Sequence, residues 1–562
     1  MSGAVLQPQG ATQRVRQAAD GQLVSFIERP CDSHAAAALA EHDAALSSSV
    51  AQVLLQRGID TPAVLQRFLR PRLQHLQAPH SMADRDAATA RIVDALKRQE
   101  RMVVFGDYDV DGTTSAALLT RVLRRLGGDV QPLIAKRFDG GYGLSARALE
   151  RCLEGRPSLL LTCDCGSTDH AQVEAARRRG VDTIVVDHHR VPDEPLPAVA
   201  FLNPHRPDCG FPFKGMASVG LVFTLAAALR TAMAARFDLR EELDLVALGT
   251  VADLAPLADD NRCLVRAGLT RLGAVQGRPG VVALRQRLSL AAGSAMSARD
   301  ISFRVAPRLN AAGRMGDAEL VLGLLLSRNA REAQQLASRL EQINQQRRAV
   351  EGRMTAEAFT QVETLYGHQP EDGLVVAARG WHRGVVGITA ARLQERYRLP
   401  VLVAAIDDDG VAHGSGRAPD GFALYDAVAK ARPLLRSFGG HQAAIGFSVQ
   451  EKHIDALRAD FAAACSAQHA ASTAARSCPY IDVTLSPGRF PLPDAAELAL
   501  LEPLGQGNAA PTFLLPDARC EGTQVIAEEH LRLDLRYQGV RLRAFAARAA
   551  QMRAQVLPCL HA

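Results

Sequence analysis

Three aspartates stand at alternate positions in the stretch VVFGDYDVDGTTSAALL, which spans residues 103–119. They are Asp107, Asp109 and Asp111, and they directly follow a short apolar run. At a separation of about 5 Å and an effective dielectric constant near 20, each pair of carboxylates repels by roughly 3 kcal/mol. A bound divalent cation would offset that repulsion. The spacing therefore predicts a metal site.

The D-x-D-x-D-G pattern also opens the calcium-binding loop of an EF-hand. That loop needs a glutamate at its twelfth position and a helix on its N-terminal side. Counted from Asp107, the twelfth residue is Leu118, and the run before Asp107 is typical of a strand. The EF-hand interpretation is therefore excluded.

Two further predicted strands end in residues that can bind a metal. LLLTCDCGST places Asp164 before a glycine turn, and TIVVDHH ends in Asp187, His188 and His189. Another acid, Asp253, follows the apolar run of LVALGTVADLAPL. A single aspartate after a strand is more often a helix N-cap. In a parallel sheet, however, ligands bind beyond the carboxyl ends of the strands, so we expect these segments to converge on one crevice.

This set of donors predicts a particular metal chemistry. Carboxylates suit Mg²⁺ and Mn²⁺, and an imidazole among them favours Mn²⁺. The number of carboxylates predicts two ions about 3.5–4 Å apart, which can polarise a phosphoryl group and acidify a bound water. The chemistry that needs such a pair is hydrolysis of a phosphate ester or anhydride.

Strands and helices alternate around these residues. RMVVFGD, PSLLLTCD and VDTIVVDHH have the pattern of strands, whereas TSAALLTRVLRRLG and HAQVEAARRRG have that of amphipathic helices. This alternation predicts a parallel sheet covered by helices on both faces. Further along the chain, the strand-like runs GLVVAAR and PVLVAAI flank the helical run GVVGITAARLQERY, which predicts a second α/β unit.

A chain of 562 residues is too long for one core and predicts three or four domains. Residues 327–365 contain no proline and have a helical spacing of apolar residues, which predicts one long connecting helix; a break near Gly352 is the alternative. Residues 464–477 have the composition of a linker. The expected parts are an N-terminal helical extension (1–85), an α/β catalytic domain (86–270), a helical connector (271–365), a second α/β domain (366–465) and a small β-barrel (475–562).

Composition places the chain among ordinary globular proteins. It has no run of 18 or more apolar residues, so we expect no membrane span, and the first residues lack the apolar core of a secretion signal. Its ten cysteines include no C-x-x-C pair, which favours a reduced, cytoplasmic location. The net charge of +5 permits nucleic acid as a partner without establishing it.

Several motifs resemble a known family. DYDVDGTTS, DCGST, DHH and GTVADLAPL resemble the four motifs of the DHH phosphoesterase superfamily. SGR and FGGHQAAIGFSV resemble its DHHA1 substrate-binding domain, and RLNAAGRMGDA and LEPLGQGNAAPTF resemble the RecJ family within it. The resemblance covers about residues 50–560. It implies a 5′→3′ exonuclease that hydrolyses single-stranded DNA to mononucleotides or short products in DNA repair and recombination.

The resemblance also implies roles for the acidic residues. His189 would contact or protonate the scissile phosphate, and Asp187 would orient a histidine through its ring N–H. Many members carry a histidine four residues before the first motif aspartate, and this chain has Phe105 at that position. The resemblance then leaves two alternatives: one ion is held more weakly, or Asp107 compensates as a catalytic group. The implied ligands of two Mn²⁺ or Mg²⁺ ions are Asp109 for one ion, Asp111, His188 and Asp253 for the other, and Asp164 as the bridge.

A nuclease must also hold the phosphate backbone, which arginine does bidentately. The resemblance places the 5′-terminal and adjacent phosphates against one set of side chains, beside turns rich in glycine or asparagine. The alternative for each arginine is a surface ion pair with a local carboxylate. The set is Arg137, Arg308, Arg314, Ser415, Arg417 and His441.

The last domain resembles an OB-fold, which binds single strands through basic grooves and stacked aromatics. We expect most of its aromatics to be core, and its arginines to contact the nucleic-acid backbone unless they only form a solvated face. The aromatics are Tyr480, Phe490, Phe513, Tyr537 and Phe545, and the arginines are Arg532, Arg536, Arg541 and Arg543.

Family resemblance implies a monomer that works with single-strand-binding protein and a RecQ-type helicase. A narrow gap between the two α/β domains would admit one strand and exclude a duplex.

Two alternative functions remain open: hydrolysis of short oligoribonucleotides or cyclic dinucleotides, and a non-catalytic DNA-binding scaffold like a eukaryotic replication-helicase subunit of this superfamily. The C-terminal OB-like domain disfavours the first, and the full set of acidic motif residues disfavours the second.

Overall fold

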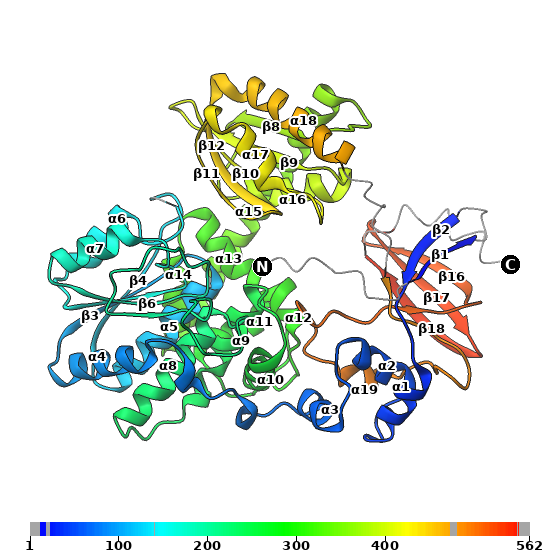
Figure 1. Ribbon diagram of the computed structural model, residues 1–562, viewed down its shortest axis with the longest axis horizontal. Helices are drawn as coiled ribbons and strands as arrows, with labels where there is room; N and C mark the ends of the chain where they lie inside the picture. Colours follow the sequence, from blue (N-terminus) through cyan, green and yellow to red (C-terminus); the bar gives the residue numbers. More distant parts are fainter. Residues whose placement is uncertain (1–11, 18–22, 140, 472–479, 548, 550–562) are drawn as a thin grey trace. The chain divides into compact units, whose positions relative to one another are not determined.

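The computed structural model describes residues 12–17, 23–139, 141–471, 480–547 and 549. They form two compact units (Figure 1). The first unit contains residues 72–471 and 503–508, and the second contains the described residues of 12–71, 480–502 and 509–549. None of the described helices combines the length and apolar character needed to cross a bilayer.

A five-stranded parallel sheet forms the centre of the first unit, as the alternating pattern predicts. Its order is β4-β3-β5-β6-β7. Helices α6 and α7 cover one face, and α4, α5 and α8 cover the other (Figure 1). The strands are β3 (Arg101–Gly106), β4 (Asp129–Ile134), β5 (Leu159–Cys163), β6 (Asp182–Val186) and β7 (Ala200–Leu202). The helices are α4 (Arg85–Lys97), α5 (Val110–Arg125), α6 (Ala146–Leu153), α7 (His170–Arg178) and α8 (Ser218–Ala232).

Strand β3 shows why both faces are covered. Met102 and Val104 pack with the side of α4, α5 and α8, whereas Val103 and Phe105 pack with the side of α6 and α7. All four side chains are fully buried. Successive residues of a strand point to opposite faces, so an uninterrupted apolar run requires helices on each.

Two helices follow that complete this domain, α9 (Leu243–Ala252) and α10 (Asp259–Gly273). Helix α9 begins beside a buried ionic cluster. The Arg278 guanidinium contacts the carboxylates of Glu242 at 2.7 Å and Asp244 at 3.0 Å, and all three side chains are buried. Arg121 of α5 also contacts Glu242, at 2.9 Å. The cluster therefore ties α5 and α9 to the connector.

The connector is helical. The long helix α15 (Ala330–Tyr366) runs without a break, so the expected single helix is confirmed and the alternative break near Gly352 does not occur. Asn329 caps its N-terminus by accepting from the backbone N–H groups of Arg331 and Glu332. The shorter elements are α11 (Pro279–Arg287), α12 (Ala298–Asp300), the π-helical turn η4 (Ile301–Val305), α13 (Ala306–Met315) and α14 (Glu319–Leu326).

The second α/β domain contains a mixed sheet of order β11-β12-β10-β9-β8, in which only β8 and β9 are parallel. Its strands are β8 (Leu374–Arg379), β9 (Val401–Ile406), β10 (Val411–Arg417), β11 (Leu435–Gly440) and β12 (Ala444–Gln450). Its helices are α16 (Val386–Tyr397), α17 (Leu424–Lys430) and α18 (Ile454–Ala471). The start of the expected linker at 464–477 is helical instead, because Ala464 and Cys465 continue the buried stripe of α18; residues 472–477 lie outside the described residues.

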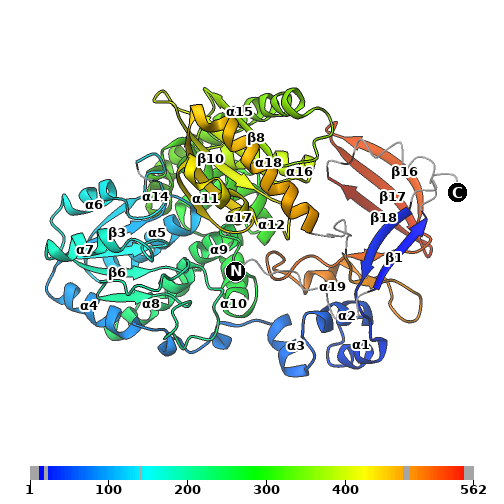
Figure 2. The same cartoon turned by 45° about the horizontal axis from the view of Figure 1, so that its top comes forward.

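The second unit contains the antiparallel sheet β16-β17-β18, formed by Arg519–Ile526, His530–Tyr537 and Val540–Ala546. Shorter elements precede it: β13 (Tyr480–Ile481), β14 (Val483–Thr484), α19 (Ala495–Ala499) and β15 (Phe513–Leu514). Figure 2 shows the same elements from a second direction.

The N-terminal region differs from the helical extension expected from the sequence, because it also contains strands. Helices α1 (Ser33–Ala40), α2 (Ser48–Gln56) and α3 (Pro62–Leu69) follow two antiparallel strands, β1 (Thr12–Gln17) and β2 (Leu23–Glu28). Strand β2 pairs in parallel with β13, which lies about 450 residues later in the chain. The pairing satisfies backbone groups that an isolated hairpin would leave exposed.

Candidate functional site

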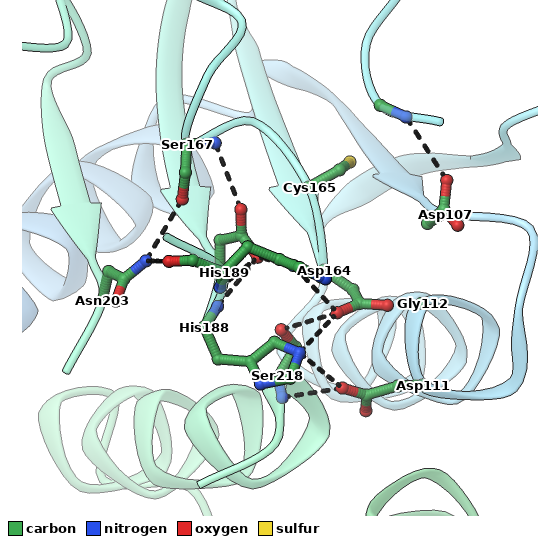
Figure 3. A network of polar contacts seen from close by, with 12 residues as sticks. Asp107, Asp111, Gly112, Asp164, Cys165, Ser167, His188, His189, Asn203 and Ser218 are labelled. Atoms are coloured by element: carbon green, nitrogen blue, oxygen red, sulfur yellow. Dashed lines mark hydrogen bonds and ion pairs between the residues drawn. The ribbon is translucent and has the colours of Figure 1, made fainter. Parts of the chain in front are cut away.

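Three of the predicted metal ligands, Asp111, Asp164 and His188, meet at the carboxyl ends of β3, β5 and β6 (Figure 3). Asp111 lies in the first turn of α5, which follows β3, and Asp164 follows β5. His188 follows β6, and Asp253 ends α9. Because the three strands are parallel neighbours, their ends deliver these groups to one place.

His188 lies at the centre of the cluster. Its Nε2 is 3.2 Å from Asp164 Oδ1, 3.8 Å from Asp253 Oδ2 and 3.9 Å from Asp111 Oδ2. This nitrogen is buried and makes no hydrogen bond. Asp111, His188 and Asp253 can offer ligand atoms within 4.8 Å of one another, and so can Asp164, His188 and His189.

The first turn of α8 fixes two of the carboxylates. The backbone N–H groups of Ser218 and Val219 donate to Asp111, at 2.8 and 3.0 Å, and the Ser218 hydroxyl donates to Asp164 at 3.1 Å. Asp164 has φ +64°, in the left-handed region that costs a non-glycine residue about 1–2 kcal/mol. The backbone is therefore strained where it presents this carboxylate.

His189 forms a charged pair with Asp187. The distance from Nδ1 to Asp187 Oδ1 is 2.7 Å. Burial alone would lower the pKa of His189, but the hydrogen bond and charge of Asp187 raise it to about 9. The carboxylate also accepts from the backbone N–H groups of Ser167, His188 and His189. His189 is therefore protonated at neutral pH and held in one orientation.

The other carboxylates repel one another. Burial and the charges of Asp109 and Asp111 raise the pKa of Asp164 well above its ordinary value. Burial and Asp109 raise the pKa of Asp111 to about 7, and burial with Asp111 and Asp109 raises that of Asp253 to about 9. Burial and the neighbouring His189 lower the pKa of His188 to about 4. The site thus combines a neutral imidazole with buried carboxylates that repel one another, a repulsion that the charge of His189 offsets only in part.

These donors fit a divalent cation. Neutral imidazole nitrogen and carboxylate oxygen are ligands of Mn²⁺ and Mg²⁺, and the orphaned Nε2 of His188 faces three carboxylates. A cation there would satisfy the nitrogen and offset the repulsion at once.

The structure places Asp109 and Asp107 differently. Asp109 caps α5 by accepting from Gly112 N–H at 3.0 Å, and its charge still reaches Asp111, Asp164 and Asp253. The Asp107 carboxylate lies apart from the two histidines and accepts from Gly143 N–H at 3.4 Å (Figure 3). Among the described residues, Asp107 is in neither of the two groups of side chains that could hold one ion.

A cleft of about 510 Å³ opens between the catalytic domain, the connector and the second α/β domain. Among the predicted phosphate ligands, Arg137, Arg314, Ser415 and Arg417 line it. Burial and the charges of Arg137 and Arg347 lower the pKa of Arg314 to about 10, and burial lowers that of Arg417. An anion in this cleft would offset the repulsion among the cations.

The wall of the cleft contains the start of α16. Gly387, its second residue, lies against Ser415 Oγ and the Arg417 guanidinium, and Arg417 donates to Ser415 Oγ at 2.8 Å. The first N–H groups of a helix favour anions. Gly384 packs against the backbone of Arg314, since a Cβ at this glycine would lie 1.9 Å from the Arg314 carbonyl oxygen.

The structure does not bring Arg308 or His441 to this cleft. Arg308 contacts Glu341 of α15 at 2.5 Å, which is the ion-pair alternative considered for it. His441 is exposed and is not among the cleft-lining residues.

Sequence reasoning missed three residues of the site. Ser218 orients two carboxylates, and Arg383 lines the cleft. The Tyr142 hydroxyl donates to the Asp164 carbonyl oxygen and lies 2.8 Å from His189 Nδ1. A tyrosine between two glycines, in GGYGLS, was the one available signal for Tyr142.

In the second unit, Phe490 and Tyr537 are core, whereas Phe545 is 56% exposed. Arg536 forms an ion pair with Glu521 at 2.5 Å. The arginines Arg532 and Arg541 are exposed on β17 and β18, where they are available to a polyanion.

Comparison with known proteins identifies three domains. Residues 101–250 match the DHH family, N-terminal domain; residues 371–467 match the DHHA1 domain; and residues 481–557 match the RecJ OB domain. The predicted fold class, a parallel-sheet α/β domain followed by a long helix, a DHHA1 domain and an OB-like domain, is confirmed.

Curated and solved relatives agree. The chain is 38% identical over 510 residues to the single-stranded-DNA-specific exonuclease RecJ of Dickeya dadantii, covering 87% of this chain and 86% of that one. It is 34% identical to RecJ of Bacillus subtilis over 91% of its own length, and it spans 64% of that relative. The crystal structure of RecJ in complex with Mn²⁺ from Thermus thermophilus superposes with a TM-score of 0.75 at 31% identity, covering 92% of this chain and 73% of that one. The chain therefore belongs to the RecJ family of single-stranded-DNA-specific exonucleases.

Proposed function

We propose that the protein is a metal-dependent exonuclease that hydrolyses single-stranded DNA from its 5′ end to mononucleotides or short products. The observation that carries this proposal is the orphaned Nε2 of His188, which faces Asp111, Asp164 and Asp253 at 3.2–3.9 Å. An arginine-lined cleft in the same unit supplies the binding site for a polyanion.

The cofactors are two divalent cations, Mn²⁺ or Mg²⁺. Solved relatives from Thermus thermophilus are in complex with each of these ions. When bound, the ions polarise the scissile phosphate and lower the pKa of the attacking water. The residues that would hold them are Asp109, Asp111, Asp164, His188 and Asp253.

The side chains of the chain itself orient the substrate and supply a proton. His189 is protonated by virtue of Asp187, so its ring presents a positive charge to the scissile phosphate and a proton to the leaving oxygen. Arg137 and Arg314 bind backbone phosphates. Arg417, Ser415 and the start of α16 hold the terminal 5′-phosphate, which sets the direction of digestion.

Selectivity for one strand follows from the cleft. Its walls come from three parts of the same unit, and a duplex is wider than a single strand. The substrate is DNA, so we place the enzyme in the cytoplasm, in DNA repair and recombination. We further propose that it acts as a monomer together with single-strand-binding protein and a RecQ-type helicase.

Digestion of DNA labelled at the 5′ or 3′ end tests this function. With Mn²⁺ or Mg²⁺, we expect 5′-labelled single strands to release label in the first products, and blunt duplexes to be cut at least about a hundredfold more slowly. Chelator should abolish turnover. Release of 3′ label first, or equal rates on both substrates without a helicase, would contradict the proposal.

A further inference from the structure

A second, smaller cavity of about 270 Å³ lies beside the metal centre. Val251, Ala252 and Leu254 line it, so it directly flanks Asp253 at the end of α9. Arg314 lines both this cavity and the larger cleft. A strand held in the cleft can therefore continue past the metal centre into the cavity.

The cavity has an apolar wall made by Val251, Leu254, Ala306, Pro307 and Ile388. Leu254 is the most exposed of these residues, at 66%. Its φ of +61° is that of the residue after a helix C-cap: its N–H donates to the Val251 carbonyl oxygen and the N–H of Ala255 to that of Thr250, which ends α9. This turn places a large apolar side chain at the cavity, one residue after the proposed metal ligand Asp253.

The lining also contains polar side chains. Ser302 and Asn310 lie on the same face of the helical run 301–315 as Ala306, and neither side chain has a hydrogen-bond partner among the described residues. Arg347 of α15 also lines it; the guanidinium contacts Glu351 and Asn344, but its Nε is buried without a partner. Ser302 belongs to the π-helical turn η4, a rare geometry that occurs frequently at functional sites.

We propose that this cavity binds the unpaired base of the nucleotide on the 3′ side of the scissile phosphate. The inference rests on the proposed function and assigns a further substrate subsite to it. Leu254 packs on the face of the base, while Ser302, Asn310 and Arg347 contact its edge. The volume is slightly below the roughly 300–1,000 Å³ of pockets for drug-sized ligands, so it suits one heterocycle.

Two properties follow from this lining. Hydroxyl and amide groups both donate and accept hydrogen bonds, so Ser302 and Asn310 can meet the edge of any of the four bases. A base already paired in a duplex has its edge occupied and brings a second base with it. The cavity therefore reads the unpaired state of the base rather than its identity.

Abasic substitution tests the subsite. The substrate is a 5′-phosphorylated single-stranded oligonucleotide, either intact or with a tetrahydrofuran abasic residue at the second position from the 5′ end. The readout is kcat/KM for the first cleavage with Mn²⁺. Loss of the base removes its apolar contact with Leu254 and its polar contacts at the edge, so kcat/KM should fall about tenfold. An abasic residue near the 3′ end should leave it unchanged.

Variants of Leu254 test whether this residue causes the loss of kcat/KM on the abasic strand. In Leu254→Ala, kcat/KM for the intact strand should fall several-fold, and the abasic penalty should shrink, because the packing partner is already missing while the contacts to the edge of the base remain. Leu254→Met should restore both values. Leu365→Ala is the matched control, since Leu365 is an exposed leucine at the end of α15, 45% exposed and away from this cavity.

The outcomes separate the two proposals. Absence of metal-dependent cleavage of the intact strand would remove the proposed function and this inference together. Normal cleavage with no abasic penalty at the second position would overturn the inference alone. So would a penalty of the same size in Leu254→Ala and in the parent protein.

Discussion

His189 has two partners at the same ring nitrogen. Asp187 Oδ1 lies 2.7 Å from Nδ1 and the Tyr142 hydroxyl 2.8 Å from it. Because the protonated ring donates to Asp187, the tyrosine hydroxyl donates to the Asp164 carbonyl oxygen instead. Tyr142 thus joins the ring of His189 to the backbone of Asp164.

Replacing Tyr142 with phenylalanine removes that link and keeps the ring. We expect kcat to fall about tenfold with KM unchanged, because the substrate contacts remain while the histidine and Asp164 lose a common support. Tyr425→Phe is the matched control, since Tyr425 is also exposed and lies in the second α/β domain. Steady-state kinetics on single-stranded DNA would measure the fall in kcat. An increase in KM alone would contradict the role given to Tyr142.

Asp164→Asn should lower the activity of the protein and raise the stability of its metal-free form. We expect kcat to fall about 10³-fold or more while single-stranded DNA still binds, because a bridging ligand serves both ions. Without metal, however, the variant should melt about 2–4 °C higher, since it removes a buried charge that its neighbours repel. Differential scanning calorimetry with and without Mn²⁺ measures this. Turnover within tenfold of the parent would exclude the bridge.

At the scale of elements, two helices carry metal ligands at one end and share an ionic cluster at the other. Helix α5 presents Asp111 and reaches the cluster through Arg121, while α9 ends at Asp253 and begins beside Glu242. Arg278 joins this cluster to the connector. The cluster therefore holds together two helices whose other ends carry Asp111 and Asp253, two of the proposed metal ligands.

Arg278→Met leaves the buried Asp244 without its ion-pair partner and leaves Glu242 with Arg121 and Arg125, so we expect a loss of about 3–5 kcal/mol of unfolding free energy at pH 7. Although burial opposes it, Arg278 holds the pKa of Glu242 below its ordinary value in the parent. The stabilisation that this lowered pKa gives is present above the pKa of Glu242 in the unfolded state. It is lost as the pH falls through the pKa of Glu242 in the folded state. In the variant the unpaired Asp244 protonates more readily, so the deficit should shrink as the pH falls to about 5.

Arg285→Met is the control for that experiment. Arg285 is also buried, but it donates to the carbonyl oxygens of Leu272, Ala274 and Ala291. Its loss leaves no unpaired charge, so its cost should not vary with pH. Urea unfolding at several pH values compares the two variants, and parallel pH profiles would contradict the proposed role of Arg278.

At the scale of the whole molecule, net charge contributes little to DNA binding. The chain carries only +5 over 562 residues, so affinity must come from local groups such as the arginines of the cleft. Each phosphate contact on a single strand contributes about −0.7 to the slope of log K against log salt.

Arg417→Ala should therefore reduce the magnitude of that slope by about 0.7 and weaken binding of 5′-phosphorylated strands about tenfold or more. Binding of 5′-hydroxyl strands should change less. Arg308→Ala is the control, because Arg308 is paired with Glu341 and is not among the cleft residues. Fluorescence anisotropy titrations provide the measurement, and equal effects of the two substitutions would contradict the assignment.

The sequence was informative where physical constraints are local. Alternation of apolar runs predicted the parallel sheet, and helical periodicity predicted α15 as one helix. It could not predict the pairing of β2 with β13, because backbone pairing over about 450 residues leaves no local pattern. The local sequence also does not tell which arginine forms an ion pair, since both Arg308 and Arg417 precede apolar or small residues. Arg308 is paired because Glu341, from another helix, reaches it.

The contact between Gly384 and the Arg314 carbonyl joins two walls of the cleft through backbone atoms. A Cβ there would lie 1.9 Å from that oxygen, whereas ordinary contact begins at 3.4 Å, so even alanine requires a shift of about 1.5 Å (3.4 − 1.9). Side-chain rotamers cannot alter such a contact. The two backbone segments that meet here are therefore held at one spacing, and the absence of a single methyl group is what permits it.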